Sequence, residues 1–229
     1  MLALSKRRIK FRPSCGENFF EENDYQKLAE DALKKAIAIL EADDWKKEKS
    51  YGNDTIYSKI VPPYGKVFKF EGILNVPPKK VLEILYNKAE EMHKWNPTVK
   101  RVKIIKKIDD FCDIAHVIAT EGAAGLVSSR DFVNVRIWKK QDSGYVQGSV
   151  SIIHPDVPDI TKYVRGEQGP TVCIMNPSND NTDSCKFQWL LNTNLKGWIP
   201  QYLIDQTLSS VMMDYVNSFR KFAAPKTSA

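Results

Sequence analysis

Hydrophobic residues follow helical spacing near the two ends of this chain and strand alternation between them. From Tyr25 to Lys47 apolar residues recur every three or four positions, which predicts an amphipathic helix ending near Trp45. A second long helix is predicted after Pro200, because proline is favoured at the first helical position. Its apolar stripe consists of Leu203, Ile204, Leu208, Val211, Met212, Tyr215, Val216 and Phe219. A stripe this broad must rest on a large apolar surface.

The middle of the chain predicts a sheet. Thr55–Val61 and Lys66–Leu74 flank the turn signal Pro62-Pro63-Tyr64-Gly65 and read as a hairpin. A second helix is predicted from Val76 to about Asn87, and a short helical piece near Glu90–Lys94. Further strands are expected at Val99–Ile108, Asp113–Thr120, Phe132–Lys139, Tyr145–Ile153, Lys162–Arg165, Thr171–Asn176 and Cys185–Asn194. Short connections throughout this region favour an antiparallel sheet, and hence a single α+β domain. We expect it to span residues 24–224, between tails at 1–23 and 225–229.

Composition bounds the partners of this domain. Of 229 residues, 42% are hydrophobic and 27% charged, which is typical of a globular protein with a sizeable core. No apolar run approaches a membrane span, and no signal peptide is recognisable, so we expect a cytoplasmic location peripheral to membranes. Strand alternation sends the basic residues of Lys100–Lys107 to both faces, so they are not expected to form a single basic surface that binds nucleic acid. A weak affinity for anionic membrane surfaces is compatible with this pattern. The net charge is only +6.

The residues that carry most metal and covalent chemistry are scattered. Four cysteines form no CxxC pair and three histidines stand alone, so no metal site is expected and reduced core cysteines are favoured. No GxSxG, Walker, GxGxxG or HExxH pattern occurs. His116 is a candidate base, although a strand histidine with no visible partner is usually structural. These observations favour a binding protein with no catalytic residue and no cofactor.

Arg136 ends the predicted strand Ser128–Arg136, where alternation puts Phe132, Asn134 and Arg136 on one face. Either this face is solvated, or a guanidinium is buried at considerable cost. Val117, on the neighbouring predicted strand, occupies the place where an acidic partner would be expected. A buried Arg136 would then lack a carboxylate, and the contents of a cavity would supply its polar partner. Alternation alone leaves both interpretations open.

Several segments, in order, resemble the START (steroidogenic acute regulatory protein-related lipid transfer) domain. The resemblance is to the branch of the steroidogenic acute regulatory protein, its late-endosomal relative and the carotenoid-binding START proteins, over roughly residues 25–222. The segments that carry it are Trp95–Val99, Gly122–Gly125, Ser129–Arg136, Tyr163–Pro170, Trp189–Trp198 and the helix after Pro200.

The resemblance implies a helix-grip fold, in which a curved antiparallel sheet wraps around the C-terminal helix and encloses an apolar tunnel for one lipid. It implies that loop 121–129 and the last helix form a gate, whose loop residues are Glu121, Gly122, Ala123, Ala124, Gly125 and Leu126. It places Arg130 structurally at the loop's exit, with Asp131 available to pair with a cation. The ligand-binding positions expected on the resemblance and on shared faces are Met92, Asn96, Val117, Phe132, Asn134, Arg136, Asn176, Trp189, Leu208, Met212 and Tyr215.

Ligand identity stays open because sterol-binding relatives carry a carboxylate where this chain has Val117. Arg136 then needs another acceptor, such as Asn176, a backbone carbonyl, water or the ligand itself. A sterol such as cholesterol and a xanthophyll carotenoid such as lutein are the two candidates. The function implied is lipid transfer between membranes, with a lipid-sensing regulatory module and an enzyme acting on a bound lipid as alternatives.

A further partner is suggested by the acidic tract at Asn18–Asp24. Phe19 and Phe20 in this tract loosely resemble a motif that recruits proteins to endoplasmic reticulum contact sites. Alternatively they pack under the first helix as a hydrophobic staple. We expect a monomer, and the resemblance leaves open that the chain is part of a longer, membrane-anchored protein.

Overall fold

The computed structural model describes residues 21–122, 125–159, 162–178 and 181–224. Its main feature is a ten-stranded sheet, accompanied by a separate two-stranded pair. The strands are β1 (Lys46–Tyr51), β2 (Asp54–Val61), β3 (Gly65–Leu74), β4 (Val99–Lys107), β5 (Cys112–Ala119), β6 (Arg130–Lys140), β7 (Tyr145–Ser151), β8 (Val164–Arg165), β9 (Glu167–Gln168), β10 (Thr171–Ser178), β11 (Asn181–Leu191) and β12 (Thr193–Asn194). Along the main sheet the order is β1-β2-β3-β11-β10-β7-β6-β5-β4, with β8 beside β6 and β12 paired with β9.

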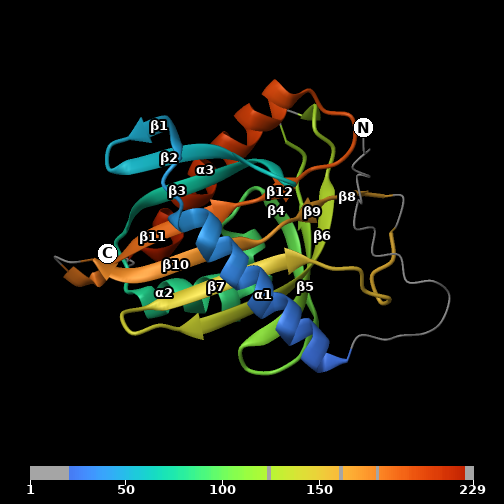
Figure 1. Ribbon diagram of the computed structural model, residues 1–229, viewed down its shortest axis with the longest axis horizontal. Helices are drawn as coiled ribbons and strands as arrows, with labels where there is room; N and C mark the ends of the chain where they lie inside the picture. The colour runs from blue at the N-terminus through green and yellow to red at the C-terminus, as the bar shows by residue number, and fades with distance from the viewer. Residues whose placement is uncertain (1–20, 123–124, 160–161, 179–180, 225–229) are drawn as a thin grey trace, which may run out of the picture.

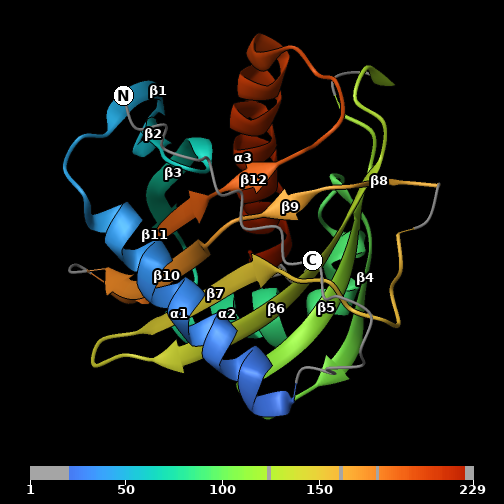
Figure 2. The ribbon, with the colours of Figure 1, turned by 45° about the vertical axis from the view of Figure 1, so that its right-hand side comes forward.

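Two long helices lie on opposite sides of this sheet. The helix α1 (Glu22–Glu41) crosses its outer face, as Figure 1 shows. The helix α3 (Gln201–Ala223) stands in the hollow of the curved sheet, with β3 and β11 on one side of it and β5 and β6 on the other (Figure 2). The expected helix-grip arrangement is therefore confirmed.

Alternation along β6 assigns its residues to the two sides. Val133 and Val135 pack in one core with Leu33 and Ala36 of α1. The next residues along the strand, Asn134 and Arg136, therefore point to the inner side. Residues that stand directly opposite each other share a face of the sheet, so the register also shows which residues of β5 and β7 point inward.

Three short helical segments line the inner side. They are α2 (Pro78–Leu82), a π-helical turn η1 (Glu83–Asn87) and a 3₁₀ segment η2 (Ala89–Lys94). Their apolar residues, including Leu82 and Leu85, share a core with Leu208 and Met212 of α3. These helical segments and α3 therefore pack together on the inner side of the sheet.

The structure corrects three details of the predicted elements. The first helix ends at Glu41 rather than near Trp45, and an edge strand β1 that the sequence did not reveal follows it. β1 is missed because its residues are almost all exposed and include no apolar alternation. The short strand β8 runs parallel to β6, so the sheet is not antiparallel throughout. Within the described residues, no helix has the length and apolarity needed to cross a membrane.

Candidate functional site

The inner face brings together most of the predicted site residues. Phe132, Asn134 and Arg136 of β6 are all buried on this side. Trp189 of β11 meets the ring of Tyr215 on α3, with 4.9 Å between the ring centroids. Leu208 and Met212 of α3 are buried in the same core, and Met92 of η2 packs against it. Residues far apart in sequence therefore converge between the sheet and α3.

Arg136 is buried, with 6% of its surface exposed, but it does not lack a carboxylate. Its Nε donates to Oδ1 of Asp113 at 2.7 Å, and its second guanidinium nitrogen lies 2.6 Å from Oδ2. The expectation of an unpaired arginine is therefore wrong. The hairpin register explains the error, because Arg136 stands opposite Asp113 whereas Val117 stands opposite Phe132.

Tyr86 completes the surroundings of this ion pair. The Arg136 guanidinium carbon lies 4.6 Å from the centre of the Tyr86 ring. Nη2 of Arg136 donates a long hydrogen bond of 3.4 Å to the backbone carbonyl of Tyr86. Burial raises the pKa of the Tyr86 hydroxyl, and the Asp113 carboxylate raises it further. This hydroxyl makes no hydrogen bond of standard geometry with the described residues, although the Asp113 carboxylate lies close enough to interact with it. Sequence reasoning missed Tyr86, since nothing local marks a tyrosine in a helical turn.

Next to the ion pair, polar side chains form a connected network. Asn134 donates to Oε1 of Gln168 at 2.7 Å and accepts from the hydroxyl of Ser151 at 2.7 Å. The backbone N–H of Gln168 donates in turn to the Ser151 hydroxyl at 2.7 Å. Asn134 was predicted as a ligand contact, and here both ends of its amide are occupied by protein groups.

Other buried polar atoms have no such partners in the described structure. They are Tyr86 Oη, Asn96 Nδ2, Gln147 Oε1, Thr193 Oγ1 and Ser209 Oγ. Gln147 faces inward because it stands opposite Trp138 on β6 and Cys173 on β10. A buried polar group without a partner costs about 1–3 kcal/mol, so such atoms mark positions where a polar group of another molecule would be favourable.

The two ends of α3 are anchored differently. At its C-terminal end Arg220 binds Asp54 through two bonds of 2.6 and 2.7 Å and also donates to the carbonyl of Ile73. Trp95 packs there edge-on against Phe219, with 5.5 Å between ring centroids. Toward the N-terminal end, the partly exposed side chains of Lys66 and Asp205 form an ion pair at 2.9 Å. The C-terminal end is the firmly held one.

The predicted gate loop lies against the N-terminal half of α3. A Cβ atom at Gly122 would come 3.4 Å from the Thr207 methyl, and Gly122 bridges to the buried Val127. Gly125 has a positive φ of 89°, which favours glycine. Glu121 and Leu126 are exposed, and Ala123 and Ala124 lie outside the described residues, as do Phe19 and Phe20. Contact between loop and helix is present; gating remains a prediction.

Two charged residues after the predicted gate loop, Arg130 and Asp131, have structural roles. Arg130 donates to the backbone carbonyls of Leu195 and Lys196, which fixes the segment leading to α3. Asp131 binds Arg165 at 2.8 Å and the His116 ring at 2.9 Å. Burial acts to raise the pKa of Asp131, but these two partners outweigh it and the pKa falls below its usual value. His116 therefore has a structural partner that the sequence did not reveal.

Asn176 does not belong to the inner site. It lines a pocket on the outer face together with Ile37 and Leu40 of α1. Its neighbour Met175 is the residue buried on the inner side. The cavity position predicted for Asn176 is therefore wrong by one step of strand alternation, which moves a side chain to the opposite face.

Comparisons with known proteins show which sequences and folds this chain is similar to. A family model described as the START domain matches residues 25–226. The mitochondrial steroidogenic acute regulatory protein of Danio rerio is 40% identical over 211 residues, covering 91% of this chain and 74% of that protein. Its Homo sapiens counterpart is 37% identical over 203 residues, covering 88% and 71%. The solved structure of human StAR-related lipid transfer protein 5 has a TM-score of 0.82 at 20% identity, covering 88% of this chain and 97% of that one, and so shares its fold.

Proposed function

We propose that this chain, which belongs to the START domain family, binds one apolar lipid between its sheet and α3 and transfers it between membranes. The observation that carries the proposal is the set of buried polar atoms without partners beside the large apolar core of the inner side. Burying a lipid of sterol size removes a few hundred Å² from water, worth several kcal/mol at about 25 cal/mol per Å². The affinity of the lipid for a membrane opposes this gain, so transfer requires the two free energies to be comparable.

A sterol is the ligand we favour. The reason to doubt it was the absence of a carboxylate facing the cavity arginine, and Asp113 supplies that carboxylate from a different position on the same strand. The similarity to steroidogenic acute regulatory proteins supports the same choice. A carotenoid with terminal hydroxyls is the alternative, and the unpartnered hydroxyls of Tyr86 and Ser209 suit an oxygen on either ligand.

The ligand is identified by extracting the protein purified from its native source and recording the mass spectrum and visible absorbance of the extract. A sterol mass with no visible absorbance band supports the favoured ligand. A polyene absorbance band assigns a carotenoid instead. Recovery of membrane lipids in the proportions of the source membrane, without enrichment of one species, contradicts a specific lipid carrier.

We propose that the protein meets membranes with the end at which α3 begins. Leu126, Trp198 and Tyr202 are 76%, 95% and 72% exposed there, beside the predicted gate. Tryptophan and tyrosine suit the membrane–water interface, where one part of the ring is apolar and the other is wet. The domain acts as a carrier without a cofactor or covalent step. Its core thiols are consistent with this, since burial raises the pKa of Cys112 and of Cys185 to about 12 and keeps both protonated at neutral pH.

Transfer is tested by tethering the gate. The variant Gly122→Cys/Thr207→Cys, in a Cys15→Ser background, joins loop and helix where the structure already brings them together. We expect the oxidised protein to exchange lipid between vesicles at least tenfold more slowly than the reduced protein, with an unchanged circular dichroism spectrum. The single variant Gly122→Cys controls for the substitution itself. Equal rates in both redox states contradict the gate, whereas binding without transfer in any state favours a lipid-sensing module.

A further inference from the structure

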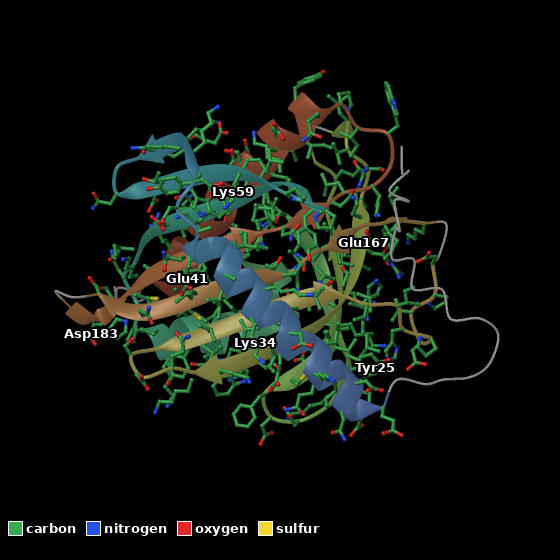
Figure 3. All side chains as sticks on the ribbon, in the orientation of Figure 1. Tyr25, Lys34, Glu41, Lys59, Glu167 and Asp183 are labelled. Atoms are coloured by element: carbon green, nitrogen blue, oxygen red, sulfur yellow. The ribbon has the colours of Figure 1, made fainter. Side chains whose placement is uncertain are left out.

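A hollow lies on the outer face of the sheet, at the C-terminal end of α1. Its volume is about 510 Å³, within the range of small-molecule sites. Glu41, labelled in Figure 3 at the end of α1, stands at its edge. The sheet separates this hollow from the inner site, because its lining residue Ile174 points to the face opposite the inward-facing Met175. The proposed function makes no use of this hollow.

The walls of the hollow already hold one ammonium group. Lys69 of β3 is only 9% exposed, and its Nζ lies 4.6 Å from the ring centre of Tyr57 and 5.1 Å from that of Trp45. Glu71 binds the same Nζ at 3.1 Å and also accepts from Gln188 at 2.9 Å. Aromatic faces and a carboxylate around a nitrogen are the elements that recognise organic cations. The chain itself fills the inner position of this arrangement.

The outer part of the hollow offers negative charge that no protein cation neutralises. Glu41 and Asp43 are both exposed, and neither forms an ion pair with any residue the structure describes. The last turn of α1 contains no basic residue, so the negative end of its dipole is also uncompensated there. Three carboxylates against one ammonium leave the lining with a formal charge of −2. An anionic ligand or an anionic membrane surface is disfavoured at this place.

The spacing of the acids distinguishes an extended cation from a metal ion. Among the described residues, no group of three acidic, histidine or cysteine side chains is close enough to hold a metal. The carboxylates of this hollow therefore act at separate points along it. The lining also includes the rings of Trp45 and Tyr57 and the amides of Gln141, Asn176 and Gln188. A flexible chain with ammonium groups separated by methylenes can reach carboxylates that do not meet around one point.

We propose that this outer hollow is a binding site for an aliphatic diamine or polyamine, distinct from the lipid site. One ammonium group lies between Glu41 and Asp43 at the mouth, and the methylenes pass along Trp45. A further nitrogen approaches the amide of Asn176. Lys69 occupies the innermost position and limits how deeply the ligand enters.

The test uses spermidine as the probe, with calorimetric titration at constant ionic strength and the indole N–H resonance of Trp45 as a local reporter. We expect the double variant Glu41→Gln/Asp43→Asn to bind about tenfold more weakly, because each partly screened carboxylate contributes about three- to fivefold. Asp214→Asn, an exposed carboxylate on α3, is the matched control and should bind as wild type does. Lys69→Met should bind spermidine more tightly, because it frees the Glu71 carboxylate and the space between the two rings.

The two kinds of variant are expected to change the affinity for spermidine in opposite directions, and the loss in Glu41→Gln/Asp43→Asn decides the proposal. Equal affinity in wild type and in the Glu41→Gln/Asp43→Asn variant overturns the proposal. So does an equal shift of the Trp45 resonance with magnesium chloride at the same ionic strength, which would indicate charge screening alone. Since Glu41 and Asp43 are exposed, their variants should fold normally, and the test does not depend on Lys69→Met. Lipid transfer should be the same in all these variants, which separates this site from the proposed function.

Discussion

The outer and inner faces of the sheet are formed by alternate residues of the same strands, yet they are packed differently. On the outer face α1 presents small and apolar residues, such as Ala29, Leu33 and Ala36, to a uniformly apolar surface. Gly148 allows this close approach, because a Cβ there would come 2.9 Å from Leu33. On the inner face large aromatic rings meet buried polar atoms that have no partner in the described structure. Beneath α1 the outer face is completed by the protein, whereas the inner face leaves polar positions for another molecule.

This difference teaches where a function resides in such a fold. A close-packed face holds the strands in register, and its substitutions act on stability. A face with unsatisfied polar atoms loses folding free energy unless something fills it, so its substitutions act on binding and stability in opposite directions. Arg136 and Asn134 are exceptions on the inner face, because Asp113 pairs with the first and Gln168 and Ser151 with the second.

The largest effect is expected from breaking that ion pair. Arg136→Met should lower the free energy of unfolding by about 3–5 kcal/mol, since it leaves the Asp113 carboxylate buried and unpaired. The double variant Arg136→Met/Asp113→Leu should recover most of the loss, because an apolar pair fits the site. Urea unfolding of both variants measures this, and Arg101→Met on the exposed side of β4 is the control.

The ligand affinity of Arg136→Met provides a second test of the same ion pair. Because the charge is already neutralised, Arg136→Met should weaken ligands with and without a terminal hydroxyl alike. A selective loss for the hydroxylated ligand would show that Arg136 contacts the ligand oxygen despite its pairing with Asp113. Equal stability of the single and double variants would show instead that the pair contributes nothing to the fold.

The next effect tests the outer face alone. Leu33→Ala removes a buried side chain from the α1 core and should cost about 3 kcal/mol of unfolding free energy, within the usual range of about 2–5. Leu28→Ala on the same helix is the matched control, because Leu28 is 37% exposed, and it should cost under about 1 kcal/mol. Thermal or urea unfolding separates the two. If Leu33→Ala also changes lipid exchange by more than its effect on folding, the two faces are coupled and the comparison fails.

The smallest effect compares two inner serines. Ser151→Ala removes a hydroxyl that donates to Asn134 and accepts from Gln168, so it should cost about 1–2 kcal/mol. Ser209→Ala removes a buried hydroxyl with no partner and should leave the ligand-free protein equally or slightly more stable. Unfolding measured with and without lipid decides the matter. If the lipid stabilises Ser209→Ala as much as wild type, Ser209 does not contact the ligand.

The sequence by itself determined the two long helices and most strands. These depend on local periodicity, because helical and strand spacing are visible within a few residues. It also determined the family, because several matching segments occur in order. The edge strand β1 was not predicted, because an exposed strand carries no alternation of apolar and polar residues.

Only the tertiary structure decided what each side chain meets. Asp113 rather than Val117 faces Arg136 because the register of the β5–β6 hairpin, which no single residue specifies, brings it there. Asn176 and Met175 differ by one position, and pairing of β10 between β7 and β11 decided which of them points inward. The unpartnered polar atoms and the ammonium-lined hollow also depend on residues far apart in the chain. Local pattern sets which residues share a face, but the surface that each face meets and the partners of each side chain are set by packing between distant segments.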